Sequence, residues 1–474
     1  MCQSSAVLVS VLSSVEIAYV VALSVWIILQ KRSPVATLAW ILALGFLPIL
    51  GFLIYVFIGP RRLWRKRMQH ANSRTIVRDL AAATASSTNN LTVPWRAQLA
   101  TLALRTSGAS LAPAKEVLVL NGGKECFDEI ERAIRQAKGH VHVLYYIFES
   151  DITGTRIRDA LIERAKAGVK VRLLVDAVGA PLPHYFVRPL LEAGAEFASF
   201  NPVIGGRLRP RINFRNHRKI VVCDGSIGFL GGINVGDEYD ESVTKKEAYR
   251  DTHMMIVGSA VRELQFTFLE DWNFATGNIV KDKNLFPNPE GIETQIVQLI
   301  PSGPDLDWEP IQNAFFTAIT LADQSVLLTT PYFVPDEAIF VAIMTAALRG
   351  VDVQILVPER SDSRIVSAAA RSYYDRLLAA GAKIYEYPKM IHAKTMVIDG
   401  KAAFVGSANM DNRSFRLNFE VSAVVYCPRA IAKLDAMFAE DRQKCRHITS
   451  RSRNKLPLAA RIAEASARLL SPLL

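Results

Sequence analysis

The sequence predicts an α/β protein made of two duplicated halves, preceded by a hairpin of two membrane-spanning helices. Three observations predict this. Two long apolar segments open the chain, helical and β-branched segments alternate after them, and the phrase His-x-Lys-x4-Asp-Gly occurs twice. Alternating helices and strands are typical of α/β folds with a parallel or mixed sheet flanked by helices. At 474 residues the chain is long enough for two or three domains, and duplication implies a pseudo-two-fold axis.

The opening apolar segments are residues 6–29, whose one charge is Glu16, and residues 35–58, which carry none. Each is long enough to cross a hydrocarbon core of about 30 Å. A signal peptide is the rival for the first, but a basic n-region is missing and a second apolar segment follows at once. Residues 1–60 are therefore predicted to form a transmembrane hairpin. Within it, Glu16 either contacts a polar partner or lies near the headgroups.

The basic residues predict how this hairpin is oriented. Only Lys31 and Arg32 lie between the two spans, whereas RRLWRKR at 61–67 follows the second span with five basic residues. Because positive flanks stay on the cytoplasmic side, this flank and everything after it are expected in the cytoplasm.

The charge and the cysteines set weaker limits. The net charge of +11 fits anionic lipid, nucleic acid or the positive flank itself, and does not choose among them. Five cysteines form an odd set without a CxxC pair. This indicates free thiols in a reducing compartment, and no metal site is predicted.

The segment 61–110 is predicted to be a basic flank and linker. Residues 111–290 and 291–448 are predicted to be the two halves. Residues 449–474 form a basic amphipathic tail that either lies on the membrane or packs on the core. The duplication rests on echoes in the same order: VHVLYYIF (141–148) with VLLTTPYF (326–333), RAKAGVKVRLLVD (164–176) with AALRGVDVQILVP (346–358), and RPLLEAGAEF (188–197) with DRLLAAGAKI (375–384).

The repeated phrase reads HRKIVVCDG from His217 and HAKTMVIDG from His392. On a strand, residues two apart point to the same face. His217 and Lys219 therefore project together, as do His392 and Lys394. One such pair means little, whereas two pairs in matched frames inside duplicated halves are specific.

Two His–Lys pairs that face each other can act on a phosphodiester without a metal. One imidazole attacks phosphorus while the other protonates the leaving oxygen. The lysines, with Asn234, Asn409 and Ser407, can hold the charge on the phosphate oxygens. Each histidine also needs an acceptor that orients it, and Asp251 and Glu420 are the candidates.

Two features of the phrases have alternative interpretations. Asp224 and Asp399 are either catalytic or, as their Asp-Gly context favours, residues of hairpin turns. Gly232 stands in the first half where the second half has Ser407. The missing hydroxyl removes one phosphate donor, and we expect a backbone N–H to replace it because glycine permits close approach.

These motifs resemble the phospholipase D superfamily, whose signature is a repeated HxK-x4-D. Over nearly the whole chain the sequence is similar to bacterial cardiolipin synthases, and this similarity rests on GGINVGDEY (231–239), TTPYFVPDEA (329–338), GSANMDNRSFRLNFE (406–420), RSPVATLAW and ARLLSPLL. The resemblance implies a protein of the bacterial inner membrane with two phospholipase D-type domains on the cytoplasmic side. The implied reaction moves a phosphatidyl group from one phosphatidylglycerol to another and releases glycerol, without a cofactor. It also implies that His217 is the nucleophile, that His392 is the general acid and later the base, and that a phosphatidyl-histidine forms.

Three rival functions stay open: a lipid hydrolase, a metal-independent nuclease and a non-catalytic membrane scaffold. The hairpin and the lack of an aromatic stacking platform argue against nucleic acid as a partner. The basic stretch 207–219 either forms a rim for anionic headgroups or a solvated loop. Tyr332 and Phe333 either line a glycerol or acyl pocket or pack in the core. Acyl-chain preference, phosphatidylethanolamine as a second substrate and the oligomeric state are not predicted.

The remaining histidines are expected to be structural. His140 and His142 alternate along a predicted strand and are interpreted as satisfied polar residues. His253 follows Asp251 closely and is a candidate to support it.

Overall fold

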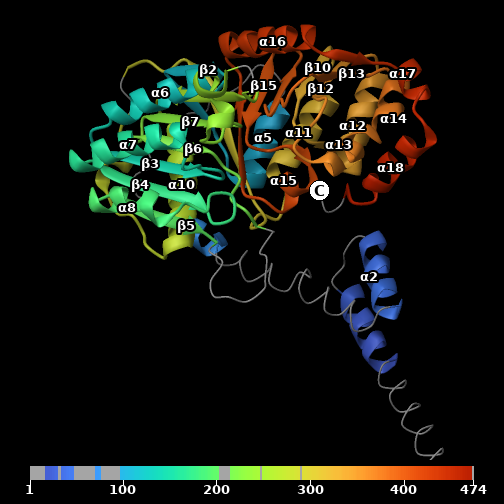
Figure 1. Ribbon diagram of the computed structural model, residues 1–474, viewed down its shortest axis with the longest axis horizontal. Coiled ribbons are helices and arrows are strands. Elements are labelled where there is room, and N and C mark those ends of the chain that lie inside the picture. Colours follow the sequence, from blue (N-terminus) through green and yellow to red (C-terminus); the bar gives the residue numbers. More distant parts are fainter. Residues whose placement is uncertain are drawn as a thin grey trace, which may run out of the picture. The chain divides into compact units, whose positions relative to one another are not determined.

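The structure is a computed structural model that describes residues 17–29, 34–46, 70–75, 97–201, 214–245, 248–288 and 291–471. Residues 17–28 and α2 (Pro34–Phe46) are helical. Glu16, the end of the second apolar segment and the flank at 61–67 lie outside these residues. In the described part of the chain, no helix has both the length and the apolar character needed to cross a bilayer. Residues 70–474 form one compact unit (Figure 1).

The first half contains a mixed sheet that has seven strands among the described residues. The last three strands in sheet order run parallel, and the other neighbours are antiparallel. The order is β2 (Glu116–Asn121), β8 (Thr252–Val257), β7 (Ile227–Gly231), β6 (Ile220–Cys223), β3 (His140–Tyr145), β4 (Lys170–Asp176) and β5 (Glu196–Phe200).

The second half repeats this sheet strand for strand, with the same directions, and adds one strand at each edge. This agreement confirms the predicted duplication in an α/β fold. The order is β1 (Leu111–Ala114), β9 (Gln295–Ser302), β17 (Glu420–Val425), β15 (Ala402–Gly406), β14 (Thr395–Ile398), β10 (Ser325–Thr329), β12 (Asp352–Pro358), β13 (Lys383–Tyr387) and β18 (Arg446–Ile448). A separate short ladder pairs β11 (Phe333–Val334) with β16 (Met410–Asp411).

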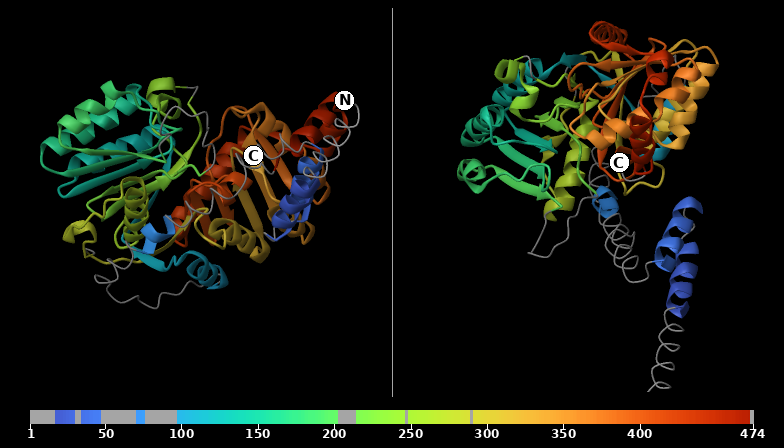
Figure 2. Two further views of the ribbon diagram at one scale, coloured as in Figure 1. Left: turned by 90° about the horizontal axis from the view of Figure 1, so that it is seen from below. Right: turned by 45° about the vertical axis from the view of Figure 1, so that its right-hand side comes forward.

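Helices cover the sheets, and Figure 2 shows the two sheet-and-helix halves next to each other. Helices of the first half are α6 (Gly123–Gln136), α7 (Ile152–Lys166), α8 (His184–Glu192), the short α9 (Glu241–Thr244) and α10 (Val261–Thr276), with a 3-10 turn η1 (Asp237–Tyr239). Helices of the second half are α11 (Pro310–Leu321), α12 (Glu337–Leu348), α13 (Arg364–Arg371), α14 (Tyr374–Ala379), α15 (Asn412–Arg416) and α16 (Pro428–Gln443). A further 3-10 turn, η3 (Lys283–Leu285), precedes β9.

The echoed segments form equivalent elements. RAKAGVKVRLLVD and AALRGVDVQILVP are the ends of α7 and α12 followed by β4 and β12. Gly168 and Gly350 lie directly after these helices at φ values of 87° and 89°. This left-handed conformation lets glycine end a helix and return the chain to the sheet. Each half also encloses its own apolar core.

The two halves interlock. α10 packs on the first sheet and also contacts β9, while its counterpart α16 packs on the second sheet and also contacts β2. The strand that follows the predicted boundary at residue 111, β1, pairs with β9 of the second half. The preceding helix α5 (Ala97–Ser107) likewise packs on α11 and β9 rather than serving as a linker.

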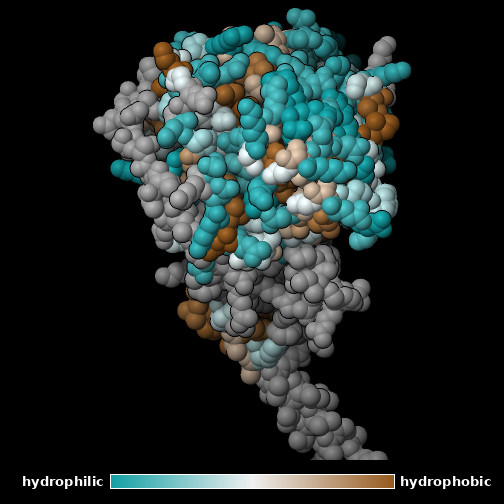
Figure 3. Space-filling view, turned by 90° about the vertical axis from the view of Figure 1, so that its left-hand side faces the viewer, coloured by the Kyte–Doolittle hydropathy of each residue, from teal (hydrophilic) through white to brown (hydrophobic). Residues whose placement is uncertain are grey.

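The C-terminal tail packs on the second half, which was one of its two predicted placements. Its helices are α17 (Ser450–Asn454) and α18 (Leu458–Arg468). α18 lies against α13, and Arg453 is anchored by Glu464 and Asp375. The outer side of α18 exposes Leu458 and Ile462. On the opposite side of the molecule, Figure 3 shows a mostly hydrophilic surface with scattered apolar residues.

Candidate active site

Each His-x-Lys pair lies in an extended segment immediately before its strand. β6 begins after Lys219 and β14 begins after Lys394, so the predicted strands start later than expected. The residues of each pair still lie together, because Lys219 Nζ donates to the carbonyl of His217 at 2.7 Å. Lys394 Nζ donates likewise to the carbonyl of His392. All four side chains are buried.

These extended segments pair with the opposite half. The backbone N–H of His217 donates to the carbonyl of Phe419 at 2.9 Å. The N–H of His392 donates to the carbonyl of Arg250 at 2.7 Å. The residues that follow these carbonyls are the two acids that the sequence singled out, Glu420 and Asp251. The backbone therefore brings each histidine beside the acid of the other half.

The side chains complete this crossed arrangement. His217 Nδ1 lies 3.0 and 3.1 Å from the two carboxylate oxygens of Glu420. His392 Nδ1 lies 2.6 Å from Asp251 Oδ2. Both carboxylates have a lowered pKa: burial would raise it, but the neighbouring histidines and lysines outweigh burial. A charged carboxylate can only accept, so Nδ1–H donates and Nε2 of each imidazole keeps its lone pair.

Burial also lowers the pKa of the histidines and lysines of this site. It lowers the pKa of His217, and it lowers that of His392 to about 3 with help from Lys394. Burial lowers the pKa of Lys394 to about 8 and that of Lys219 well below its usual value. An anionic phosphodiester placed among these groups would raise all four values, because it favours their charged forms.

Two of the predicted phosphate ligands line the pocket, and a third, Ser407, does not. Asn234 and Asn409 line the pocket that holds both histidines. Asn409 Oδ1 is buried without a hydrogen-bond partner. Ser407 does not line the pocket, and its hydroxyl donates to Glu420 Oε2. Ser407 therefore orients Glu420, and the expectation that it binds phosphate directly is not supported by these contacts.

Gly232 has a different role from the one expected. Its N–H is occupied by the carbonyl of Thr252 at 3.0 Å, so it does not replace the Ser407 hydroxyl as a phosphate donor. A Cβ at Gly232 would lie 2.2 Å from Asp251 Oδ1. Asp251 is one methylene shorter than Glu420, and its carboxylate lies against the backbone at this point. Glycine is required at position 232 because the shorter side chain of Asp251 brings its carboxylate close to the backbone there.

Asp224 and Asp399 make turn contacts. Asp224 accepts from the backbone N–H groups of Lys138, Gly139 and His140 at 2.7–2.8 Å. Asp399 accepts in the same way from residues 323–325, at the start of β10. Both have a φ near 53°. A strand separates each from its histidine by roughly 20 Å along the chain, so neither belongs with the catalytic side chains.

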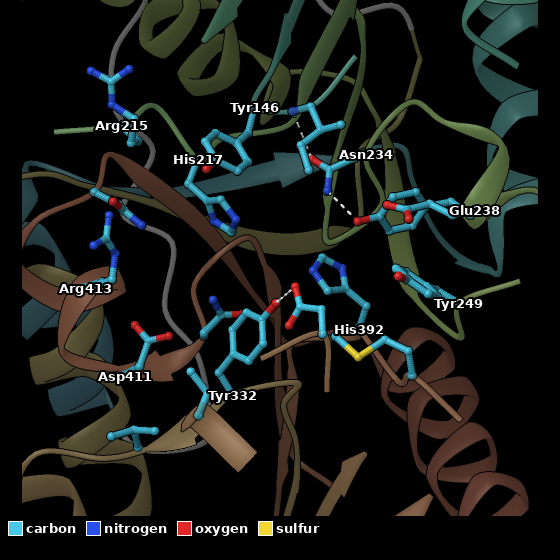
Figure 4. Close-up of a pocket in the computed structure, with 18 residues that line it drawn as sticks. Tyr146, Arg215, His217, Asn234, Glu238, Tyr249, Tyr332, His392, Asp411 and Arg413 are labelled. Carbon is cyan, nitrogen blue, oxygen red and sulfur yellow. Dashed lines mark hydrogen bonds between the residues drawn. The ribbon is translucent and has the colours of Figure 1, made fainter. Parts of the chain in front are cut away.

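The histidines share a pocket of about 540 Å³, shown in Figure 4. Tyr146 packs edge-on against His217 with ring centres 4.8 Å apart, and Tyr239 packs on His392 at 5.4 Å. Tyr239 also accepts a hydrogen bond from Asn234 at 2.7 Å. Tyr332 lines the pocket and donates to Asp362 at 2.7 Å, whereas Phe333 is fully buried in the core.

Arg215 was predicted only as part of the basic stretch 207–219. Other pocket residues were not identified from the sequence: Tyr146, Glu238, Tyr239, Tyr249, Asp362, Met390 and Arg413. One signal could have found some of them. Arg215 and Met390 each precede the histidine of a His-x-Lys motif by two residues. Glu238 and Arg413 follow Asn234 and Asn409 by four residues. Aligning the halves beyond the phrases would have placed these pairs at equivalent positions.

Arg218, the residue between His217 and Lys219, holds the site in place through buried contacts. Arg218 is fully buried and binds Asp271 through Nη1 at 2.7 and 2.8 Å. Its Nε donates to the carbonyl of Glu420 at 3.0 Å. Asp271 in turn accepts from His70 at 2.8 Å. Residues 207–213 of the basic stretch lie outside the described residues, and in its described part, 214–219, Arg215 and Arg218 are buried.

The other histidines behave as structural residues. His140 and His142 both hydrogen-bond to Gln265, at 3.0 and 2.8 Å, which confirms the prediction for them. His253 is buried, and burial lowers its pKa to about 3. Its contacts do not reach Asp251 through a hydrogen bond, because both of its ring nitrogens lack a partner.

Solved structures support the fold. Phosphatidylserine synthase from Haemophilus influenzae superposes with a TM-score of 0.59 at 16% identity, over 80% of this chain and all of that one. A polyphosphate kinase from Porphyromonas gingivalis gives a TM-score of 0.50 at 14% identity, over 81% of this chain and 56% of that one. At these identities the likeness concerns the fold alone.

Sequence comparisons reach further. A family model described as "Cardiolipin synthase, PLD-like domain" matches residues 130–246 and again 315–442, once in each half. A "Phospholipase_D-nuclease N-terminal" model matches residues 17–60. The cardiolipin synthase of Geobacillus kaustophilus is 41% identical over 98% of this chain and 94% of its own length. Cardiolipin synthase 1 of Bacillus cereus is 40% identical over 96% and 92%. The chain therefore belongs to the bacterial cardiolipin synthase family of the phospholipase D superfamily.

Proposed function

We propose that this protein is a phosphatidyltransferase that makes cardiolipin and glycerol from two molecules of phosphatidylglycerol. The observation that carries the proposal is the pair of crossed contacts, His217 with Glu420 and His392 with Asp251, around one pocket. Two imidazoles that are each oriented by a buried carboxylate can supply the nucleophile and the general acid of a double displacement at phosphorus.

In the first step, one histidine attacks the phosphorus of phosphatidylglycerol through Nε2. The bound phosphodiester raises the pKa of the other imidazole, which thereby carries a proton on Nε2. The P–O bond to the headgroup breaks, the leaving oxygen takes this Nε2 proton, and free glycerol departs. The family resemblance assigns the attack to His217 and the proton to His392. The product on the protein is a phosphatidyl-histidine.

In the second step, a hydroxyl of another phosphatidylglycerol attacks the same phosphorus. Its proton passes to the imidazole that served as the acid, the N–P bond breaks, and cardiolipin is formed. Asn234 and Asn409 line the pocket at this position, and Lys219 and Lys394 are buried next to it, with Lys394 Nζ 2.8 Å from His392 Nδ1. We expect these four side chains to supply donors for the phosphate oxygens. Water in place of the lipid hydroxyl would give phosphatidic acid, so the balance of products depends on how well water is excluded.

The substrate requires the site to be at a membrane. We propose that residues 6–29 and 35–58 form a transmembrane hairpin and that the basic flank holds the catalytic part on the cytoplasmic side. The apolar composition and the match of an N-terminal family model to residues 17–60 support this. A reporter fused after Arg67 should read out as cytoplasmic, and an external readout would reverse the topology.

The first test of the activity is direct. The purified protein is added to phosphatidylglycerol vesicles without divalent metal, and lipids and free glycerol are followed together. Cardiolipin and glycerol should rise in equal amounts and be lost in His217→Ala and His392→Ala. Phosphatidic acid without cardiolipin would make the protein a hydrolase, and unchanged lipid would refute the proposed substrate.

A further inference from the structure

The pocket around the histidines has two chemically different ends. Arg215 and Arg413 lie on the side of His217, and Glu238 and Tyr249 lie on the side of His392 (Figure 4). The basic end adjoins His217. Both guanidiniums are close enough to lower the pKa of Tyr146 against the effect of burial, and the ring of Tyr146 packs on that histidine. Asp411 lies at the same end as Arg413 (Figure 4), so this end has two arginines and one carboxylate, whereas the other end is rich in carboxylate and phenol groups without an arginine or lysine among the residues that line the pocket.

This difference breaks the pseudo-two-fold symmetry at equivalent positions. His217 and His392 are 175 residues apart, and the same spacing relates Arg215 to Met390 and Glu238 to Arg413. One position thus holds arginine in one half and methionine in the other, and the second holds glutamate in one half and arginine in the other. The crossed geometry gathers both arginines at one end. A symmetric reaction at phosphorus does not require such polarity, whereas an asymmetric ligand does.

Arg215 is built to receive an anion. It is 2% exposed and makes one ion pair, with Asp176 at 3.1 Å through Nη1. Its Nε and Nη2 are buried without a hydrogen-bond partner, although the residue lines the pocket. A buried guanidinium N–H without an acceptor is costly, and phosphate is a ligand that its planar fork matches.

The opposite end does not suit a phosphate. Glu238 and Asp362 line it together with Tyr249 and Tyr332. Their carboxylates would repel an anion, while carboxylates and phenols can hydrogen-bond the hydroxyls of glycerol. A ligand with a second phosphate is therefore accommodated at the end of Arg215 and Arg413.

We propose that Arg215 and Arg413 bind the phosphate of the acceptor phospholipid, one glycerol bridge away from the phosphate that reacts. This inference rests on the proposed function and deepens it. In the second step the acceptor hydroxyl attacks phosphorus on the face away from the histidine that carries the phosphatidyl group, while its own phosphodiester stays intact at the arginines. Because the arginines adjoin His217 (Figure 4), this placement makes His392 the carrier and His217 the acid and later the base, the reverse of the roles that the family resemblance implies. The same two groups hold the second phosphate of cardiolipin after transfer. Phosphatidylglycerol is thereby selected as acceptor over free glycerol or water, which lack that phosphate.

The test compares two acceptors of one intermediate. The full-length protein is given phosphatidylglycerol vesicles and deuterium-labelled glycerol, so that labelled phosphatidylglycerol reports transfer to glycerol and cardiolipin reports transfer to lipid. In Arg413→Gln and Arg215→Lys, the ratio of cardiolipin to labelled phosphatidylglycerol should fall by on the order of tenfold, the worth of a charge-assisted hydrogen bond. Arg416→Gln is the matched control, because Arg416 lies on the same helix, is half exposed and pairs with Asp336 outside the pocket.

The outcomes separate the two proposals. A reduced ratio in the two pocket variants and an unchanged ratio in the control supports the second phosphate site. An equal loss of both products in the pocket variants would mean that the arginines hold the reacting phosphate or the local structure, and would overturn it. If the unaltered protein formed neither product, the proposed function itself would fail.

Discussion

His217 of the first half is hydrogen-bonded to Glu420 of the second half, with Nδ1 3.0 Å from Oε1. The reciprocal contact of His392 with Asp251 means that neither half carries a complete histidine–acid pair of its own. The active site therefore exists only where the halves meet. The backbone bridges at Phe419 and Arg250 that build it also join the two sheets into one unit.

Replacing Glu420 by Gln should reduce kcat by on the order of 10³-fold, because a neutral amide neither fixes the Nδ1–H tautomer nor stabilises the imidazolium. KM for phosphatidylglycerol should change little, since Glu420 does not line the pocket. Steady-state kinetics on mixed micelles measure both. A variant with normal kcat would show that the crossed contact is only structural.

Replacing Gly232 by Ala should disable His392 by displacing Asp251, because the new Cβ would lie 2.2 Å from Asp251 Oδ1. We expect a loss of kcat on the order of 10²-fold, comparable to the loss of a positioned proton-transfer group. Ser407→Gly is the matched exchange in the other half. It removes the hydrogen bond that the Ser407 hydroxyl donates to Glu420 and the one that it accepts from the backbone N–H of Val421, and should cost roughly tenfold. Similar activities of the two variants would contradict this asymmetry.

Asp224→Asn should lower stability and leave the chemistry intact. The carboxylate accepts three backbone N–H groups before β3, so its loss should cost about 1–3 kcal/mol of unfolding free energy. Thermal unfolding in detergent reports this loss, and activity per folded molecule should stay near that of the unaltered protein. Asp399→Asn should behave alike, and a folded but inactive protein would restore a catalytic role.

The sequence was sufficient for what depends on local pattern. Chain order, strand periodicity and the Asp-Gly turns predicted the duplicated sheets and the His–Lys pairs, because these follow from residues close together in the chain. The crossed acids could not be assigned, since Asp251 and Glu420 follow their own histidines at comparable distances and spacing does not reveal pairing between halves. Tyr146 was missed, and Arg215 was predicted only as part of the basic stretch 207–219, for a similar reason: only the folded pocket shows that the guanidinium of Arg215 is buried with Nε and Nη2 lacking a hydrogen-bond partner.

The lysine pair should set the alkaline limb of activity. Burial lowers the pKa of Lys394 to about 8, against the opposing effect of Asp251, Glu420, Asp411 and Asp362. The histidines have pKa values below 6.5 and do not titrate in this range. kcat/KM, which reports the free enzyme, should therefore fall as pH rises through about 8. Lys394→Arg should move this limb upward because guanidinium stays charged, and an unmoved limb would assign it to another group.

The buried contact behind the site predicts a pH-dependent stability. His70 donates to Asp271 at 2.8 Å and to Asp305 at 3.1 Å, with Arg218 and Arg74 beside the same acids. Burial alone would lower its pKa, but Asp305 and Asp271 outweigh burial and raise the pKa to about 9. Because this pKa lies above that of the unfolded chain, 6.5, protonated His70 stabilises the fold fully below about pH 6.5. The contribution is lost as pH rises through about 9. His70→Gln, which keeps one donor but cannot ionise, should therefore lower the unfolding temperature most near pH 6 and least above about pH 9. A difference that stayed constant over this range would show that His70 is neutral in the folded protein, and the two acids would then need their charge balanced by the arginines alone.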